Sequence, residues 1–136
     1  MISKKSKYAL KALGYLAARH GRGPVVIAEI SADRKIPQKF LESILLLLRK
    51  SNILHSRKGK GGGYILARLP GKITVAEVLR AVEGPIAPLP CVSLNFYEKC
   101  ADCQERTCGV RRIMANTRDA TLKVLEKSTL LDLVDR

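Results

Sequence analysis

The sequence predicts a mainly α-helical protein with one small β-hairpin. Apolar residues recur at helical spacing in several separate segments, and one glycine-rich turn with strand-forming flanks lies among them. The composition is 46% hydrophobic and 27% charged over 136 residues, which is typical of a globular chain that buries a modest core. We therefore expect one domain, or a small domain with an added element.

The first predicted helix runs from about residue 3 to residue 20 and stops at Gly21. Its apolar positions are Tyr8, Ala9, Ala12, Leu13, Leu16 and Ala17. Lys11 and Arg19 interrupt the apolar part and no small-residue cleavage site follows, so we interpret it as an amphipathic helix of a cytoplasmic protein, not a signal peptide. The longest apolar run, residues 44–48, is far too short to cross a membrane.

Two further helices are predicted close together. A short apolar helix lies within residues 25–35, and a second begins near Pro37, a residue that suits a first helical turn. One face of the second helix is apolar, with Leu41, Ile44, Leu45 and Leu48. Its other face carries Gln38, Lys39, Glu42 and Ser43. This arrangement is typical of a helix-turn-helix, whose second helix enters the major groove of DNA.

A strand, a tight turn and a second strand are predicted next. Residues 53–56 and 64–67 are the strand-forming flanks, and the turn contains Gly59, Gly61, Gly62 and Gly63. The tip of the hairpin is basic, with Arg57, Lys58 and Lys60. A cationic hairpin directly after a helix-turn-helix is a wing, whose tip reaches phosphates or the minor groove. A nucleotide-binding loop fits poorly, because these glycines lead into a strand and not into the start of a helix.

The positive charge is concentrated in the first half of the chain. Residues 1–70 hold 15 Lys/Arg against 3 Asp/Glu, whereas residues 71–136 hold 10 against 9. A basic half of this kind favours a polyanion, and double-stranded DNA is the leading candidate. An anionic membrane surface and a merely solvated cationic face are the alternatives.

Two helices are predicted in the second half. A short one follows Thr74, which is spaced from Glu77 as in a capping box, and it stops at Gly84. A long one begins after Cys108, with an apolar stripe of Val110, Ile113, Met114, Thr117, Thr121, Val124 and Leu125. This stripe needs a partner, and a second copy of the chain would give a two-fold homodimer. Packing against the first helix of the same chain is the alternative.

All the cysteines fall in one polar segment, spaced C-x8-C-x2-C-x4-C: Cys91, Cys100, Cys103 and Cys108. The segment favours thiolate, because Cys108 lies at a predicted helix start and Arg106, Arg111 and Arg112 are close in sequence. Thiolates hold iron–sulfur clusters or zinc, and they also carry redox chemistry without a metal. All these uses stay open on the spacing alone, whereas a structural disulfide fits poorly with a reducing cytoplasm.

A small thiol oxidoreductase built on Cys100 and Cys103 is the competing interpretation from another class, and a purely structural zinc-bound adaptor is the third. The segment lacks the strand–helix context of thioredoxin-like proteins, and the basic half would then have no role. We therefore predict that the chain is not an enzyme.

Nearly the whole chain resembles a family of bacterial transcription regulators, the IscR/NsrR/CymR-type or Rrf-two family. The resemblance is carried by "SKYALKALGYLA", by the segment from "IAEISADRKIPQKFL" to "RKGKGGGYILAR", by "ITVAEVLRAVEG", and by the closing "TLKVLEKSTLLDLV". It implies a winged helix-turn-helix head with a long C-terminal dimerisation helix. By position, Gln38, Lys39, Glu42 and Ser43 match the family's base-reading face, and Lys58 matches the wing residue that enters the groove.

Many members hold an iron–sulfur cluster on three loop cysteines, and others sense by thiol chemistry alone. The resemblance thus implies a cluster, 2Fe–2S in the first place and 4Fe–4S as the alternative, with Cys91, Cys100, Cys103 and Cys108 as candidate ligands. Cys91 is the most distant in sequence. This chain departs from the family in its fourth cysteine, in Arg111 where some members have a ligating His, and in Lys7 where some have an acidic ligand.

These predictions divide the chain into three parts. Residues 1–84 form a winged helix-turn-helix DNA-binding domain, residues 85–108 a cysteine-containing sensor loop, and residues 109–136 a dimerisation helix with the C-terminal segment. The loop is expected between the dimer helix and the head, where a change in its cluster or redox state alters operator affinity. A coupling of about 1–3 kcal/mol makes a usable switch.

Overall fold

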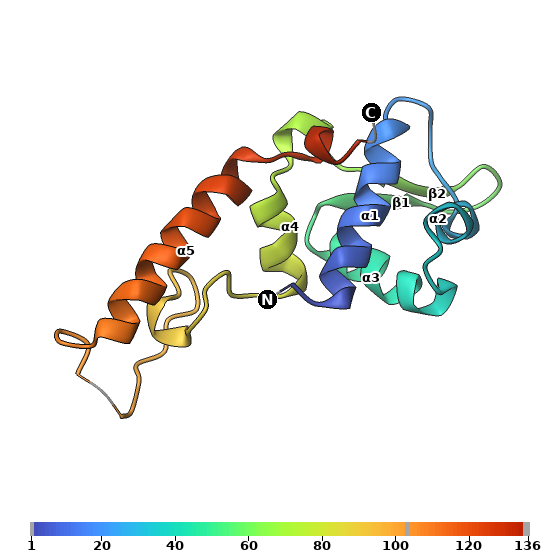
Figure 1. The fold of residues 1–136 in the computed structure, drawn as a ribbon. Coiled ribbons are helices and arrows are strands. Elements are labelled where there is room, and N and C mark those ends of the chain that lie inside the picture. The colour runs from blue at the N-terminus through green and yellow to red at the C-terminus, as the bar shows by residue number, and fades with distance from the viewer. Residues whose placement is uncertain (1, 103, 135–136) are drawn as a thin grey trace.

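The computed structural model describes residues 2–102 and 104–134 and shows a helical head from which one long helix projects (Figure 1). The elements in chain order are α1 (Lys4–Ala18), α2 (Ile27–Arg34), α3 (Gln38–Lys50), β1 (Leu54–Arg57), β2 (Gly63–Leu66), η1 (Pro70–Lys72), α4 (Val75–Val82), η2 (Pro90–Val92), α5 (Gly109–Lys127) and η3 (Leu130–Leu133), where η marks a 3-10 helix. The predicted mainly α fold with a two-stranded antiparallel hairpin is confirmed. Within the described ranges, no helix combines the length and the apolar character that a bilayer crossing requires.

The core of the head is built around α3. Its apolar face is completely buried and consists of Leu41, Ile44, Leu45 and Leu48. Helix α1 packs against this face, and its small buried residues Ala9 and Ala12 allow a close approach. Burying side chains of the size of leucine contributes roughly 1.5–3 kcal/mol each, so this contact holds the helices of the head together.

Most helix boundaries lie within two residues of the predicted ones. Helix α1 begins after Ser3, whose hydroxyl oxygen accepts a hydrogen bond of 3.2 Å from the Ser6 backbone N–H, and it ends at Ala18, before residue 20. Pro37 is the N-cap of α3 and not part of its first turn, because its ψ of 126° is extended. Each strand is displaced by one residue from its predicted range.

The predicted capping box of α4 is half present. The Thr74 hydroxyl accepts a hydrogen bond of 3.1 Å from the Glu77 backbone N–H, as predicted. The Glu77 carboxylate, however, pairs with the guanidinium of Arg68. The planar guanidinium offers two charge-assisted hydrogen bonds, which outweigh the single backbone N–H that a capping box would use.

The residues after α5 return to the head. Leu130 of η3 is fully buried in the core, and the backbone of Leu133 lies against Gly14 of α1. A Cβ at position 14 would lie 3.0 Å from the Leu133 carbonyl oxygen, so glycine permits this approach. The alternative expectation was that the long helix packs against the first helix. The contact with α1 is instead made by η3, while α5 contacts α4 and η2.

Glu83, directly after α4, connects this helix to the start of α1. Its Oε1 accepts hydrogen bonds from the Ser3 backbone N–H at 2.8 Å and from the Ser6 hydroxyl at 2.7 Å. These hydrogen bonds, first from Ser3 and then from Ser6, lower the pKa of Glu83 below its ordinary value. The ionised carboxylate is therefore the form that stabilises the contact between α1 and α4.

Replacing Glu83 by Gln should lower the free energy of unfolding at pH 7 by about 1 kcal/mol, because a charged acceptor becomes neutral. Since the pKa of Glu83 is lower in the folded chain than in the unfolded one, its contribution is fully present above the ordinary value of 4.5. It is lost as the pH falls through the lowered folded-state value. Urea unfolding of both proteins should therefore give stabilities that converge in acid. A difference independent of pH, or an equal effect of Glu98→Gln in the exposed loop, would contradict this.

Candidate DNA-binding surface and cysteine loop

The turn between α2 and α3 fixes the direction of α3. Lys35 ends α2 in the left-handed conformation, with φ 55°, and Ile36 is buried behind it. The Ser31 hydroxyl donates a hydrogen bond of 2.6 Å to the Ile36 carbonyl oxygen, while the Ile36 N–H bonds back to Ser31 at 3.1 Å. With the apolar face of α3 in the core, the opposite face is presented to solvent, including Gln38, Lys39, Glu42 and Ser43, all exposed.

The side chains on this outward face differ in their hydrogen-bonding state. The Ser43 hydroxyl donates to the Phe40 carbonyl oxygen of its own helix at 2.7 Å, so its oxygen remains available as an acceptor. No hydrogen bond or ion pair within the described ranges engages the Glu42 carboxylate. A carboxylate at this place can accept from cytosine N4 and repels phosphate.

The hairpin is bonded both to the segment before α2 and to α3 itself. Tyr64 of β2 exchanges backbone hydrogen bonds of 2.9 and 2.8 Å with Val25, just before α2. A Cβ on Gly63 would lie 2.4 Å from the Val25 carbonyl oxygen, so this contact requires glycine. Arg49 of α3 reaches Ser56 of β1 at 3.4 Å. The basic residues of the wing, Arg57, Lys58 and Lys60, are all exposed.

A second basic feature, which the sequence analysis did not identify, lies along α1. A groove beside this helix has an apolar part, with Ile2, Leu10 and Leu133, and a rim that carries Lys4, Lys7, Lys11 and Arg34. The Nζ atom of Lys4 lies 5.8 Å from the ring of Tyr8, which in turn meets Phe40 of α3 edge-on at 5.6 Å. The sequence feature that could have identified this basic face is the spacing of the three lysines by three and four residues, which puts them on one side of the helix.

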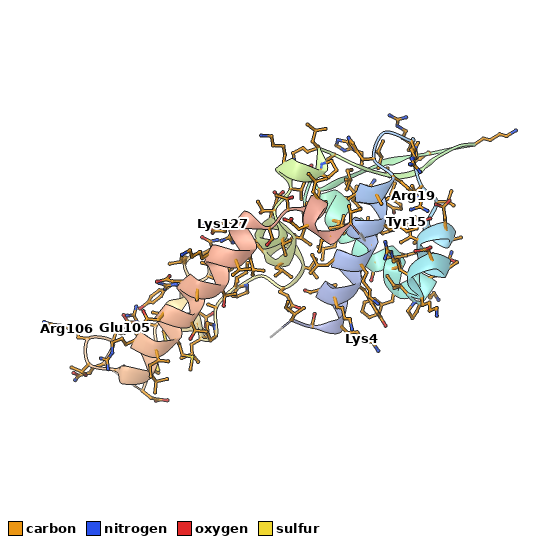
Figure 2. The ribbon with its side chains drawn as sticks, turned by 45° about the horizontal axis from the view of Figure 1, so that its top comes forward. Lys4, Tyr15, Arg19, Glu105, Arg106 and Lys127 are labelled. Atoms are coloured by element: carbon orange, nitrogen blue, oxygen red, sulfur yellow. The ribbon has the colours of Figure 1, made fainter. Side chains whose placement is uncertain are left out.

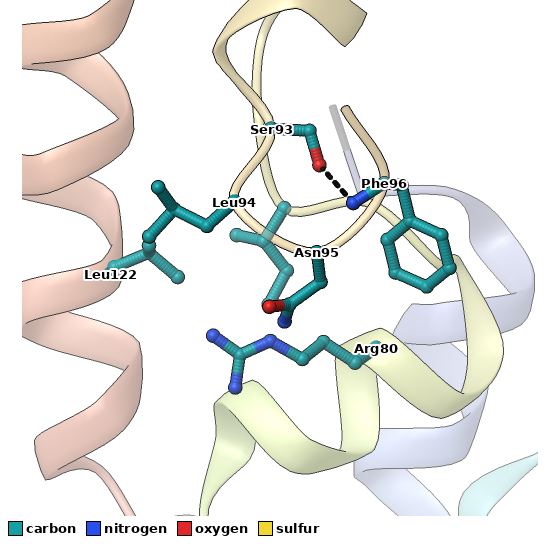
Figure 3. A pocket seen from close by; sticks show the side chains of 7 residues that line it. Arg80, Ser93, Leu94, Asn95, Phe96 and Leu122 are labelled. Carbon is teal, nitrogen blue, oxygen red and sulfur yellow. Dashed lines mark hydrogen bonds between the residues drawn. The ribbon is translucent and has the colours of Figure 1, made fainter. Parts of the chain in front are cut away.

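Cys91 is the buried cysteine among those that the structure describes. It lies in η2, is 6% exposed, and packs against α5. Arg118 of α5 holds this segment, because its Nη1 donates a hydrogen bond of 2.7 Å to the Val92 carbonyl oxygen. The residues that follow line a small pocket between α4 and α5, where Arg80 extends toward Leu122 (Figure 3).

The remaining cysteines belong to the loop at the far end of α5. Figure 2 shows Glu105 and Arg106 at the end of α5 farthest from the head, and Lys127 at the near end. Cys100 and Cys108 are half-buried there, while Cys103 lies outside the described residues. The expected position between α5 and the head is therefore found for residues 93–96, which line the pocket between α4 and α5. The rest of the loop must reach the start of α5, about 28 Å from its end at 1.5 Å per residue.

Cys108 lies at the start of α5, as predicted. Its Sγ is the N-cap of α5 and accepts a hydrogen bond of 3.4 Å from the Arg111 backbone N–H. The Arg111 guanidinium lies 3.9 Å from the Glu105 carboxylate, and its buried Nε has no partner within the described ranges. Tyr97 donates a hydrogen bond to Glu105, and this bond raises the pKa of Tyr97.

These residues fit an iron–sulfur cluster chemically. Thiolates are its usual ligands, and a helix N-terminus with a buried N–H donor stabilises the negative charge of thiolates and sulfides. Among the described residues, which leave out Cys103, no three Cys, His, Asp or Glu side chains are gathered as metal ligands. Cys100 and Cys108 flank Cys103 in sequence and are half-buried, whereas Cys91 is buried in η2.

A helix-turn-helix followed by an anchored cationic hairpin defines the winged helix-turn-helix class of DNA-binding proteins. The chain belongs to the Rrf2 (Rrf-two) family, because the family model described as "Iron-dependent Transcriptional regulator" matches residues 2–136. The family resemblance in the sequence is thereby confirmed.

Individual relatives agree. The chain is 41% identical over 138 residues to an rrf2-like HTH-type transcriptional regulator of Rhodobacter capsulatus, covering 98% of this chain and 92% of that protein. Its structure is similar to that of CymR, "the Global Cysteine Regulator of B. subtilis", with a TM-score of 0.81, 32% identity and coverage of 98% and 95%. It is also similar to T. potens IscR, with a TM-score of 0.77, 28% identity and coverage of 98% and 85%. These relatives are DNA-binding transcription regulators and not enzymes, as predicted.

Replacing Arg118 by Ala should expose Cys91. Loss of one charged hydrogen bond permits local opening of η2, so alkylation of Cys91 in reduced, metal-free protein should be faster by about tenfold. Mass spectrometry of the peptide that contains Cys91 measures this rate. Lys123→Ala, at an exposed position of the same helix, is the control and should leave the rate unchanged. An unchanged rate in Arg118→Ala would mean that packing alone holds η2.

Proposed function

We propose that this family member is a cytoplasmic, sequence-specific regulator whose operator affinity is controlled by an iron–sulfur cluster at the cysteine loop. The observation that carries the proposal is the position of Cys100 and Cys108, half-exposed at the N-terminal end of α5 and flanking Cys103 in sequence. The family description as iron-dependent supports it. We retain residues 1–84 as the DNA-binding domain, 85–108 as the sensor loop and 109–136 as the dimerisation region.

On double-stranded DNA, α3 enters the major groove and the hairpin lies along the sugar–phosphate backbone of the DNA. Gln38, Lys39, Glu42 and Ser43 then face base edges, while Arg57, Lys58 and Lys60 contact phosphates or the adjacent minor groove. The exposure of all these side chains supports this docking. Because the first half of the chain holds 15 Lys/Arg, binding should be strongly dependent on salt concentration.

The occupant of the outer face of α5 is a second copy of the chain. This face is opposite to the buried Leu122, and it carries Val110, Ile113 and Val124, which are 59%, 59% and 63% exposed. With Thr117 and Ala120 they recur at intervals of three and four residues, the pattern of a helix-pairing seam. A two-fold dimer would present two α3 helices to successive major grooves, about 34 Å apart.

When bound, the cluster supplies a redox-active and oxygen-sensitive anionic centre. Cys100, Cys103 and Cys108 would hold it. Arg111 would stabilise the negative charge from the first turn of α5. Cys91 would remain a packing residue of η2.

A change in the loop reaches the head through α5. Arg80 of α4 is 3.1 Å from Glu126 near the end of α5, and η3 continues from there into the core beside α1. A bond between the Ser128 carbonyl and the Val75 N–H, 2.8 Å long, joins the same regions. Reordering the loop at one end of a stiff helix would thus alter how the two heads are held.

A cluster-free thiol switch is the second candidate. It is favoured by the structural similarity to CymR, which is described as a cysteine regulator. In this case Cys100, Cys103 or Cys108 would be oxidised or modified reversibly, and the same connection through α5 would carry the signal. The two candidates share the DNA-binding surface. They differ only in the chemistry of the cysteines, which bind a cluster in the first candidate and are oxidised or modified in the second.

Two substitutions should separate affinity from sequence preference. Lys58→Ala removes a phosphate contact, so it should weaken binding to all duplexes and reduce the slope of log K against log salt concentration by about one. Glu42→Ala should instead change the preferred sequence, because it removes a base-edge acceptor. Selection from a random duplex library, followed by titration at several salt concentrations, measures both.

The wild-type selection should yield an operator of two half-sites about one helical turn apart, as expected for a dimer. Arg22→Ala, at an exposed position outside α3 and the hairpin, is a charge-matched control for Lys58→Ala. An unchanged preferred sequence in Glu42→Ala would show that the assigned base-reading face is wrong.

The cofactor is tested with four single Cys→Ala variants purified without air. Wild type should contain iron and sulfide and show visible absorbance that bleaches in air. Cys100→Ala, Cys103→Ala and Cys108→Ala should lose most of the iron, whereas Cys91→Ala should retain it. Colourless, metal-free protein whose DNA affinity responds to oxidants would favour the thiol switch, and stoichiometric zinc would exclude the cluster.

A further inference from the structure

One apolar side chain lies in the middle of the outward face of α3. Leu46 is 39% exposed. Its neighbours along this face of the helix, Ser43 and Lys50, are polar. Lys39, Ser43, Leu46 and Lys50 follow one another at intervals of four, three and four residues, so they form one line along the helix. Three members of this line are suited to phosphates or to base edges. Leucine is the exception.

Packing within the chain does not account for Leu46. The core face of α3 is completed by Leu41, Ile44, Leu45 and Leu48, all fully buried on the opposite side of the helix. Leu47 is less exposed than Leu46, and Phe40, which is also 39% exposed, is held on the α1 side by its edge-on contact with Tyr8. Leu46 therefore presents its apolar surface to whatever lies against this face.

Base edges in the major groove offer one apolar group, the C5-methyl of a pyrimidine. We propose that Leu46 reads such a methyl group, normally that of thymine, within the operator. The proposal rests on the docking of α3 described above. A leucine there also disfavours other bases, because it covers the N4 donor of cytosine or the N6 donor of adenine without accepting a hydrogen bond. Position 46 thus contributes to specificity through contact and exclusion, and not through charge.

The test uses the duplex selected by the full-length wild-type protein from a random library. Each thymine is replaced singly by deoxyuridine, which removes only the C5-methyl. At one thymine of each half-site, the replacement should weaken wild-type binding by about fourfold, the value expected for one buried carbon of this kind. Leu46→Ala should bind the thymine and deoxyuridine duplexes equally well. Alanine suits an exposed helical position, and unchanged thermal unfolding shows that the variant is folded.

Leu69→Ala is the matched control, because Leu69 is an exposed leucine of the same head outside α3. It should keep the wild-type response to deoxyuridine. 5-Methylcytosine carries the same C5-methyl group as thymine. Replacing single cytosines by 5-methylcytosine therefore tests whether Leu46 also recognises the methyl group on this base. A gain in affinity that depends on Leu46 at such a site would support the proposal with 5-methylcytosine as the ligand.

Methyl effects that are absent, or that persist in Leu46→Ala, would overturn the assignment of Leu46 while leaving sequence-specific binding intact. Failure of the wild-type protein to select any sequence is a different result, and it would overturn the proposed function as well.

Discussion

The orientation of α3 depends on the complete burial of its leucine-rich face. Leu41, Ile44, Leu45 and Leu48 contact α1, α2, α4 and β1 together, so most elements of the head meet on this one surface. Turning α3 about its axis would expose side chains worth roughly 1.5–3 kcal/mol each. The opposite face is thereby presented to solvent, and its polar residues need no further support to be accessible.

Helix α5 depends on different interactions. Leu122 is its one buried residue, so the helix is held by Arg118, by Arg80 and by the connection through η3. Its N-cap is the sulfur of Cys108. A chemical change at this sulfur therefore acts directly on a helix terminus, where the capping interaction and the helix dipole are worth about 0.5–2 kcal/mol. This is the same range as the free energy that couples two sites in a protein switch.

Local patterns predicted most elements of the head and the candidate residues on α3 and the hairpin. The alternation of apolar and polar positions in residues 38–50 was sufficient to separate the buried face from the exposed one. The cap at Thr74 was predicted because Ser or Thr at this spacing has a specific local partner. The second half of the capping box, a hydrogen bond from the Thr74 backbone N–H to the Glu77 carboxylate, was predicted wrongly. This carboxylate pairs with Arg68, which lies outside the four-residue pattern. Likewise, the burial of Cys91 depends on α5, and no pattern around Cys91 indicated it.

The sequence alone determined the fold class, the cationic hairpin, the polar face of α3 and the cysteine-rich segment, because each depends on residues that are close along the chain. Only the tertiary structure decided that Cys91 is buried, that η3 returns to Gly14, and that Leu46 lies exposed in line with Lys39 and Ser43. The physical reason is that burial and side-chain pairing depend on which distant segments meet. That outcome follows from packing the whole chain into one core, with its non-local contacts formed together.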